Sequence, residues 1–174
     1  PFRPHIHHKE SFESDGFVQP FTDSPLDNES VGETVYLNLI NSAKDYVYIN
    51  TPYLILDNEM ITALSQAAKR GVDVRIVTPH IGDKWFVHAV TRANYAFLIE
   101  DGVKIYEYTP GFIHSKTFVV DGEYAVVGTI NLDYRSLYLH YECGAWLYKN
   151  SSIKTIYDDY VETLKVCQLI TLQD

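Results

Sequence analysis

Apolar positions along the chain follow two spacings, one typical of helices and one typical of strands. Val35, Leu39 and Ala43 recur at the spacing that gives a helix one buried face. Elsewhere, β-branched and aromatic residues gather in short runs, as they do in strands. These patterns predict helices over residues 33–43, 57–70, 84–100 and 152–169, and strands over 46–50, 72–77, 103–108, 113–120, 124–128 and 142–148.

Helices that alternate with strands favour an α/β fold, with a mixed sheet sandwiched between helices and one hairpin that carries the chemistry. We expect the sheet to be parallel at first and antiparallel at the hairpin. Asp57 or Asn58 is suited to cap the second helix, and Gly71 to end it. Residues 1–30 show no sustained period, so we expect a linker or extended arm there and a single domain over 31–174.

The predicted hairpin turns at Asp121-Gly122, which separates two apolar runs. A two-residue turn needs positive φ at both positions, and Asp-Gly is a strong signal for it. Such a turn pairs Val120 with Glu123.

Counting back along that register sets His114 opposite Thr129. Strand alternation then places His114, Lys116 and Thr129 on one face, where a phosphate could touch all three. Asp121 would lie about 17 Å from Lys116 along the strand. We therefore expect Asp121 to serve the turn rather than the chemistry.

The residue types around the hairpin suit the cutting or exchange of a phosphodiester. The imidazole of His114 can attack phosphorus, and it needs a partner on its other ring nitrogen to fix its tautomer. Glu142 is the candidate partner, since it opens the predicted strand 142–148. Lys116 would act as a point charge on the phosphate oxygens, and Thr129 and Asn131 would donate neutral hydrogen bonds.

The pattern His114-x-Lys116-x4-Asp121-x6-Gly128-Thr129-x-Asn131 resembles the HKD motif of the phospholipase D superfamily. That superfamily builds one active site from two such motifs, and this chain holds one. Four further segments resemble bacterial cardiolipin synthases, in the region of their C-terminal catalytic domain. They are TPYLILD at 51–57, AAKRGVDVRI at 67–76, GVKIYEY at 102–108 and NLDYRS at 131–136.

The resemblance implies a phosphatidyl transfer between two phosphatidylglycerol molecules, which gives cardiolipin and glycerol through a phosphohistidine. One motif's histidine takes the phosphatidyl group, and the other acts as general acid and then as base. We favour the acid–base role for His114. Glu142 stands at the acid of the family pattern. Two positions depart from the family pattern. Thr129 stands where the family usually has serine, and His140 stands where asparagine is commoner.

The resemblance also implies partners outside this chain. They are an upstream HKD half of the same protein, phospholipid substrates, and a membrane reached through an N-terminal anchor. A chain that starts at Pro1 and has only Met60 as methionine suggests a piece of a longer protein. We expect that protein at the bacterial cell membrane, and this segment to be soluble on the cytoplasmic side.

The net charge and the composition bear on which partners and ligands the chain can have. A net charge of −9 argues against a nucleic-acid partner. His5, His7 and His8 lack a second cluster of ligands, so we expect neither a metal nor a cofactor. We interpret Cys143, in a predicted strand, and Cys167, near the end of a helix, as buried thiols.

Two alternatives remain open at this point. A single-motif phosphodiesterase or nuclease could complete its site by homodimerisation, with the same histidine chemistry. A lipid-binding fragment without catalysis is the second, although binding alone does not require a nucleophile.

Overall fold

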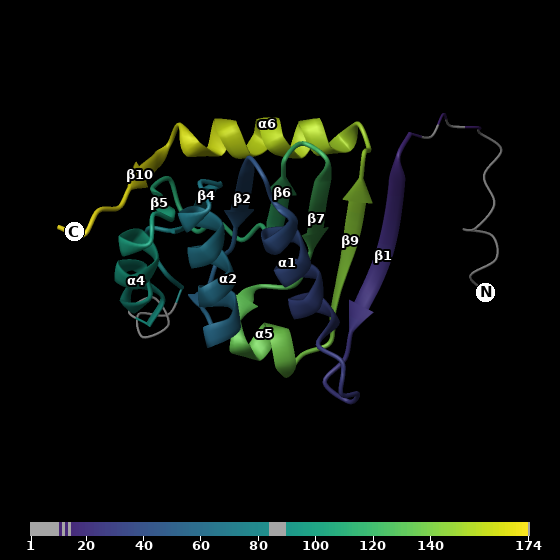
Figure 1. Ribbon diagram of the computed structural model, residues 1–174, viewed down its shortest axis with the longest axis horizontal. Coiled ribbons are helices and arrows are strands. Elements are labelled where there is room, and N and C mark those ends of the chain that lie inside the picture. Colours follow the sequence, from purple (N-terminus) through teal and green to yellow (C-terminus); the bar gives the residue numbers. More distant parts are fainter. Residues whose placement is uncertain (1–10, 12, 14, 84–89, 174) are drawn as a thin grey trace.

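The computed structural model describes residues 11, 13, 15–83 and 90–173, and it contains an eight-stranded sheet with helices on both faces (Figure 1). The strand order is β1-β9-β7-β6-β2-β4-β5-β10. The strands are β1 (Phe17–Asp23), β2 (Tyr46–Asn50), β4 (Asp73–Pro79), β5 (Lys104–Tyr108), β6 (Thr117–Val120), β7 (Tyr124–Gly128), β9 (Glu142–Tyr148) and β10 (Cys167–Leu169). Short strands β3 (Leu54–Ile55) and β8 (Leu132–Asp133) pair separately. The helices are α1 (Val31–Ser42), α2 (Asn58–Lys69), α4 (Tyr95–Glu100), α5 (Tyr134–Tyr138) and α6 (Ser152–Leu164).

The sheet is mixed, as the sequence predicts. Strands β2, β4 and β5 run parallel, and β6, β7, β9 and β1 continue the sheet in antiparallel pairs. Asp57 caps α2 by accepting a hydrogen bond from the Met60 backbone at 2.9 Å. Gly71 follows α2 with φ +95°, a conformation that glycine adopts without steric cost.

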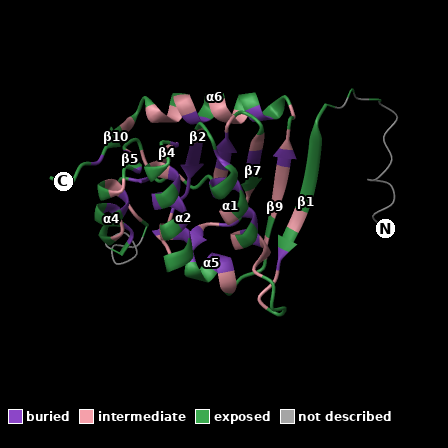
Figure 2. Cartoon of the chain, in the orientation of Figure 1, coloured by how far each residue is buried: buried purple, intermediate pink, exposed green. Residues whose placement is uncertain are grey.

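The main core lies between the sheet and helices α1, α2 and α4. Side chains of alternate residues on β2, β4 and β6, such as Ile49, Ile76 and Phe118, are buried there. A second layer under α6 contains Val119, Ala125 and Ile153. Figure 2 shows the central strands buried and β1 largely exposed. The sheet is therefore covered on both faces at its centre, while the β1 end is open.

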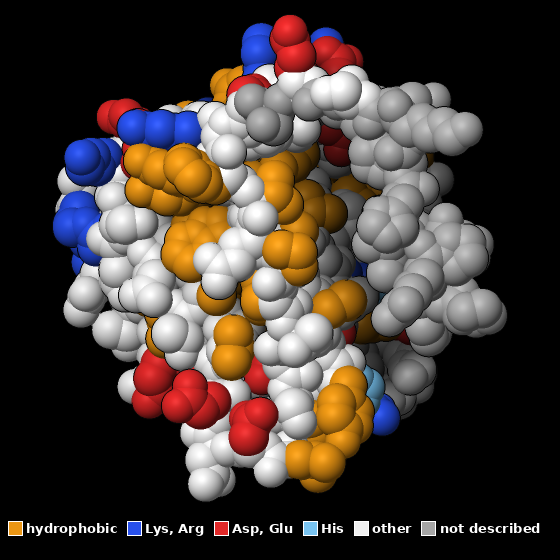
Figure 3. Space-filling model, turned by 90° about the vertical axis from the view of Figure 1, so that its right-hand side faces the viewer, with side chains coloured by type: hydrophobic (Ala, Val, Ile, Leu, Met, Phe, Trp, Pro, Cys, Tyr) orange, Lys and Arg blue, Asp and Glu red, His pale blue; other side chains and the backbone are white. Residues whose placement is uncertain are grey.

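Strand β1 falls within the arm predicted over residues 1–30. Its sequence, FVQPFTD, has no clear alternation, and its place in the sheet comes from pairing with β9, with Phe17 opposite Tyr148. Phe17 and Val18 are 70% and 54% exposed. Figure 3, which views the molecule from this side, shows hydrophobic side chains gathered there.

The hairpin turn differs from the prediction by one residue. Asp121 and Gly122 both have positive φ (52° and 68°), and Glu123 N donates to Val120 O at 3.0 Å, as expected. However, Val120 pairs with Tyr124, so Glu123 is an extra residue, as in a β-bulge. The Glu123 carbonyl accepts a hydrogen bond from Lys149 N at 2.8 Å, which draws it out of the hairpin ladder.

The chain end was also predicted incorrectly. The final helix stops at Leu164, and Cys167–Leu169 forms β10 beside β5 rather than helix. Cys143 is exposed rather than buried, because β9 borders the exposed edge strand β1 at that point. In the predicted helix 84–100, the described part is interrupted by a turn at Asn94, and residues 84–89 lie outside the described residues.

Within the described part of the chain, none of the helices has both the length and the apolar character needed to cross a membrane.

A charged cluster at the start of β4 gives the fold a testable pH dependence. Asp73 accepts hydrogen bonds from Arg75 Nε at 2.9 Å, Lys104 Nζ at 2.8 Å and Tyr48 OH at 3.0 Å. Burial alone would raise the pKa of Asp73, but these hydrogen bonds outweigh it and lower the pKa from 3.8 to about 2. The resulting stability is present above the ordinary pKa and is lost as the pH falls towards 2.

Asp73→Asn should therefore lower the free energy of unfolding by about 1 kcal/mol at neutral pH, after allowance for solvent screening. Near pH 2 the variant and the wild type should be nearly equal. Urea unfolding at both pH values measures this, with Asp158→Asn, in an exposed helical pair with Lys154, as the control. A loss of the same size at both pH values would contradict the assignment.

Candidate active site

A pocket at one end of the hairpin locates the candidate site, independently of the spacing of polar residues along the chain. The pocket has a volume of about 450 Å³ and lies where β6 begins and β7 ends. Asn50, the last residue of β2, pairs with Thr117, so this is the edge at which the parallel strands end. The residues that line the pocket are His114, Ser115, Lys116, Thr117, Val127, Gly128, Thr129 and Asn131. Four of the predicted site residues therefore come together.

His114 and Lys116 lie just before β6 rather than within it. The strand begins at Thr117, not at Ile113 as the sequence predicts. The Lys116 ammonium donates to the His114 carbonyl at 2.6 Å, a bond that folds this short segment onto itself. His114 is exposed, and its ring centroid lies 5.7 Å from that of Phe112. The imidazole is thus open to a ligand.

Lys116 is the buried cation of the site, with a residue exposure of 9%. Burial lowers its pKa, and the nearby carboxylates of Glu142 and Asp133 oppose that shift. A largely desolvated ammonium interacts more strongly with a phosphate oxygen than an exposed one does. Its position at the pocket wall suits it to hold a phosphate charge.

Glu142 is the centre of a hydrogen-bond network at the start of β9. The Thr129 hydroxyl donates to Oε2, and the Ser136 hydroxyl donates to Oε1 at 2.7 Å. His140 Nδ1 lies 3.8 Å from Oε1, and its other nitrogen accepts from Arg135 Nε at 2.8 Å. Among the described residues, Glu142 makes no hydrogen bond to His114, so the predicted pairing is not seen. The reason is that His114 precedes the strand that would carry it towards β9.

Asn131 is fixed through its backbone, which leaves its amide facing the pocket. Its N–H donates to Ser136 Oγ at 2.8 Å, and its Oδ1 is buried without a hydrogen-bond partner among the described residues. The preceding Ile130 carbonyl accepts from Tyr36 OH at 2.9 Å, and the Tyr36 ring stacks on Phe118 at 4.0 Å. Helix α1 thereby holds the loop that presents Asn131. The unpaired Oδ1 can accept a hydrogen bond from a polar ligand group.

Asp121 lies at the far end of the hairpin and supports the fold. Its carboxylate accepts backbone hydrogen bonds from Lys44 at 2.8 Å, Asp45 at 2.9 Å and Tyr46 at 2.8 Å. These three bonds join the hairpin turn to the start of β2. Asp121 does not line the pocket.

Ser136 and Asp133 organise the site, although the sequence patterns give neither residue a role. Asp133 caps α5 by accepting from Ser136 N at 2.9 Å, and Ser136 then links Asn131 to Glu142. An aspartate just before a short helical run is a capping signal that could have revealed Asp133. The role of Ser136 depends on a contact across the fold, with no local signal.

Gly128 is required by the close approach of β7 to β9. A Cβ built there would lie 2.4 Å from the Cys143 carbonyl oxygen and 2.7 Å from Gly144 Cα. Gly128→Ala should push the strands apart beside Thr129 and cost about 2 kcal/mol of stability. Gly111→Ala is the matched control, because its Cβ would meet nothing within 4 Å. Thermal unfolding of both variants tests this, and equal stability would contradict it.

Within the described residues, no three His, Cys, Asp or Glu side chains are grouped so as to hold a metal ion. His5, His7 and His8 lie outside the described residues.

Comparisons with known proteins agree on the family. A family model described as "Cardiolipin synthase, PLD-like domain" matches residues 36–165. The chain is 54% identical over 158 residues to an uncharacterized protein of Streptococcus mutans, covering 91% of this chain and 34% of that protein. It is 42% identical over 151 residues to a cardiolipin synthase of Alkalihalophilus pseudofirmus, with 87% and 30% covered. The chain thus spans about a third of the length of these curated relatives.

Solved structures show the same fold. A phospholipase D family member, Nuc from Salmonella typhimurium, superposes with a TM-score of 0.75 at 19% identity, covering 88% of this chain and 97% of Nuc. Phosphatidylserine synthase from Haemophilus influenzae gives a TM-score of 0.69 at 17% identity, covering 88% of this chain and 40% of that chain.

Proposed function

The chain belongs to the family of phospholipase D-like domains of cardiolipin synthases, and from this premise we propose that it is the C-terminal catalytic half of such an enzyme. The proposed reaction joins two phosphatidylglycerol molecules into cardiolipin and glycerol. The observation that carries it is the pocket that gathers His114, Lys116, Thr129 and Asn131. Cardiolipin synthases about 40% identical to the chain support the substrate.

In the first step, a histidine of the upstream half attacks the phosphorus of one phosphatidylglycerol. The bond from phosphorus to the headgroup glycerol breaks, and His114, as imidazolium, gives its proton to the leaving oxygen. In the second step, neutral His114 takes the proton from a hydroxyl of the second lipid. That oxygen attacks the phosphohistidine, the P–N bond breaks, and cardiolipin leaves.

The other side chains support these steps by charge and position. Lys116 would bind the non-bridging phosphate oxygens, and Asn131 would add a neutral hydrogen bond. Thr129 would contribute through Glu142, because its hydroxyl proton is directed to that carboxylate. Glu142 is then the group that holds Thr129 and Ser136 in place and balances the charge of Lys116.

The proposal can be tested by phosphatidylglycerol conversion in mixed micelles, with the full-length protein and with this chain alone, each with and without EDTA. We expect cardiolipin and glycerol from the full-length protein only, at rates that EDTA does not change. Turnover by this chain alone would favour the alternative of a homodimeric phosphodiesterase or nuclease. Loss of activity with EDTA would contradict histidine chemistry without a metal.

The proposed function also includes a location at the membrane. The full-length protein would act at the bacterial cell membrane, where its lipid substrates lie, with an upstream segment as the anchor.

A further inference from the structure

A second group of ionisable side chains lies around Glu107, near the end of β5. The Glu107 side chain is fully buried, with 0% exposure. Its Oε1 forms an ion pair with Arg92, whose Nε lies 3.0 Å away, and accepts a hydrogen bond from Tyr95 OH at 3.2 Å. Its Oε2 lies 2.7 Å from His80 Nδ1. Both oxygens of the carboxylate are satisfied, as burial of a charge requires.

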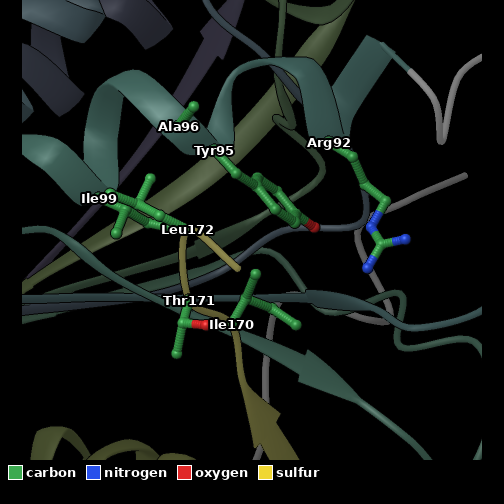
Figure 4. Close-up of a pocket in the computed structure, with 7 residues that line it drawn as sticks. All are labelled: Arg92, Tyr95, Ala96, Ile99, Ile170, Thr171 and Leu172. Carbon is green, nitrogen blue, oxygen red and sulfur yellow. The ribbon is translucent and has the colours of Figure 1, made fainter. Parts of the chain in front are cut away.

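His80 and Arg92 themselves are open to solvent. Their side chains are 43% and 42% exposed, although both are anchored on a buried group. Arg92 pairs with Glu107 through Nε, so its two terminal nitrogens are the part of the guanidinium that would meet a ligand. Figure 4 shows the Tyr95 hydroxyl directed towards the Arg92 guanidinium. An arginine fork beside an imidazole is a donor set suited to an oxyanion.

This cluster occupies the same edge and the same face of the sheet as the His114 pocket. Glu107 and Ile105 share a face of β5, and Ile105 belongs to the main core. Lys116 and Phe118 are likewise two residues apart, and Phe118 belongs to that core as well. His80 follows the end of β4, and only β2 separates β4 from β6. The lateral distance between β4 and β6 is therefore about 10 Å.

Direct contacts connect the two places. Leu54 on β3 pairs with Leu132 on β8, just after the HKD motif. On its other side, Leu54 N donates a hydrogen bond to Thr91 Oγ1 at 3.4 Å, and Asn94 Nδ2 donates to the Leu54 carbonyl at 3.1 Å. Arg92 is therefore placed by the same short strand that supports the catalytic loop.

We propose that His80 and Arg92, held by Glu107, bind the phosphodiester of the acceptor lipid while the donor phosphodiester reacts at His114 and Lys116. This inference rests on the proposed function and names the subsite for the second substrate. The attacking hydroxyl and the phosphate of the acceptor are one glycerol apart, so the proposal requires the side chains of His80 and Arg92 to reach across part of the roughly 10 Å between β4 and β6. Arg92 and His80 are the solvent-exposed members of the cluster, and the Arg92 guanidinium supplies the positive charge and the N–H donors that a phosphodiester oxygen accepts.

The test compares two acceptors that compete for one covalent intermediate. The full-length protein is given phosphatidylglycerol together with 1-butanol, and the ratio of cardiolipin to phosphatidylbutanol is measured. The donor step is common to both products, so the ratio reports the acceptor alone. Arg92→Gln should lower the ratio about ten-fold, the effect of one charge-assisted hydrogen bond, with butanol transfer nearly unchanged.

Three variants complete the design. His80→Gln should also lower the ratio, and Arg92→Lys, which keeps a charge near Glu107, should lower it less than Arg92→Gln. Lys104→Gln is the matched control, since it removes an exposed cation from the opposite end of β5, and it should leave the ratio unchanged. The Arg92→Lys variant keeps the test valid if Arg92→Gln fails to fold.

An unchanged ratio in folded Arg92 and His80 variants would overturn the subsite. A parallel fall of both products would overturn it too, because it would show that the cluster only supports the fold. Wild-type protein that makes phosphatidylbutanol but no cardiolipin would instead contradict the proposed function.

Discussion

Replacing His114 with alanine in the full-length protein is expected to reduce phosphatidyl transfer at least about a thousand-fold, while stability changes by less than about 0.5 kcal/mol. The reason is that the imidazole is exposed and lies against Phe112 at the rim of the pocket, without a role in the core. Initial rates of cardiolipin formation and urea unfolding of the same preparations measure both effects. Activity within ten-fold of wild type would exclude His114 from the reaction.

The leaving group then distinguishes the two roles of His114. A p-nitrophenyl phosphodiester releases an anion that needs no proton, so loss of a general acid matters less for it. We expect the loss of rate caused by His114→Ala to be about a hundred-fold smaller on this substrate than on phosphatidylglycerol. An equal loss on both substrates would make His114 the nucleophile and assign the acid–base role to the upstream histidine.

Replacing Asp121 with alanine should have the second large effect, and on stability rather than on catalysis. The substitution removes three backbone hydrogen bonds to Lys44, Asp45 and Tyr46 and places alanine at φ 52°. The expected loss in the free energy of unfolding is about 3 kcal/mol. The folded fraction should keep activity within about three-fold of wild type, since Asp121 does not line the pocket.

Two further substitutions separate the causes of that loss. Asp121→Gly removes the carboxylate but relieves the strain of positive φ, and Asp121→Asn keeps one acceptor oxygen. Stability should therefore fall most for alanine, less for glycine and least for asparagine. Asp121→Asn with wild-type stability and no activity would overturn the structural role and place the carboxylate in the chemistry.

The sequence predicts β2, β7 and β9 at their observed limits because each is a short run of apolar residues with turn signals on both sides. The sequence patterns give the wrong secondary structure where contacts between distant segments determine it. The segment Cys167–Leu169 could continue a helix, but the free edge of β5 pairs with it as a strand. Strand β1 lacks alternation and is ordered by β9. Glu123 is an extra residue in the hairpin, and its carbonyl accepts a hydrogen bond from Lys149 N. No local sequence pattern reveals this contact.

For the candidate site, spacing along the chain suffices to identify which residues meet, and the pocket gathers His114, Lys116, Thr129 and Asn131. Spacing does not determine which of them pair. Glu142 bonds Thr129 and Ser136 because β9 lies beside β7, whereas His114 precedes β6. The cluster around Glu107 joins three separate elements, so no sequence motif marks it.

We propose that this hairpin is half of a site that transfers a phosphatidyl group to a lipid hydroxyl. The full product balance of the full-length protein on phosphatidylglycerol tests this most directly. We expect cardiolipin and glycerol in equal amounts, with little phosphatidic acid, and no turnover of a DNA substrate. Phosphatidic acid as the main product, or cleavage of DNA, would show hydrolysis in place of transfer and would contradict it.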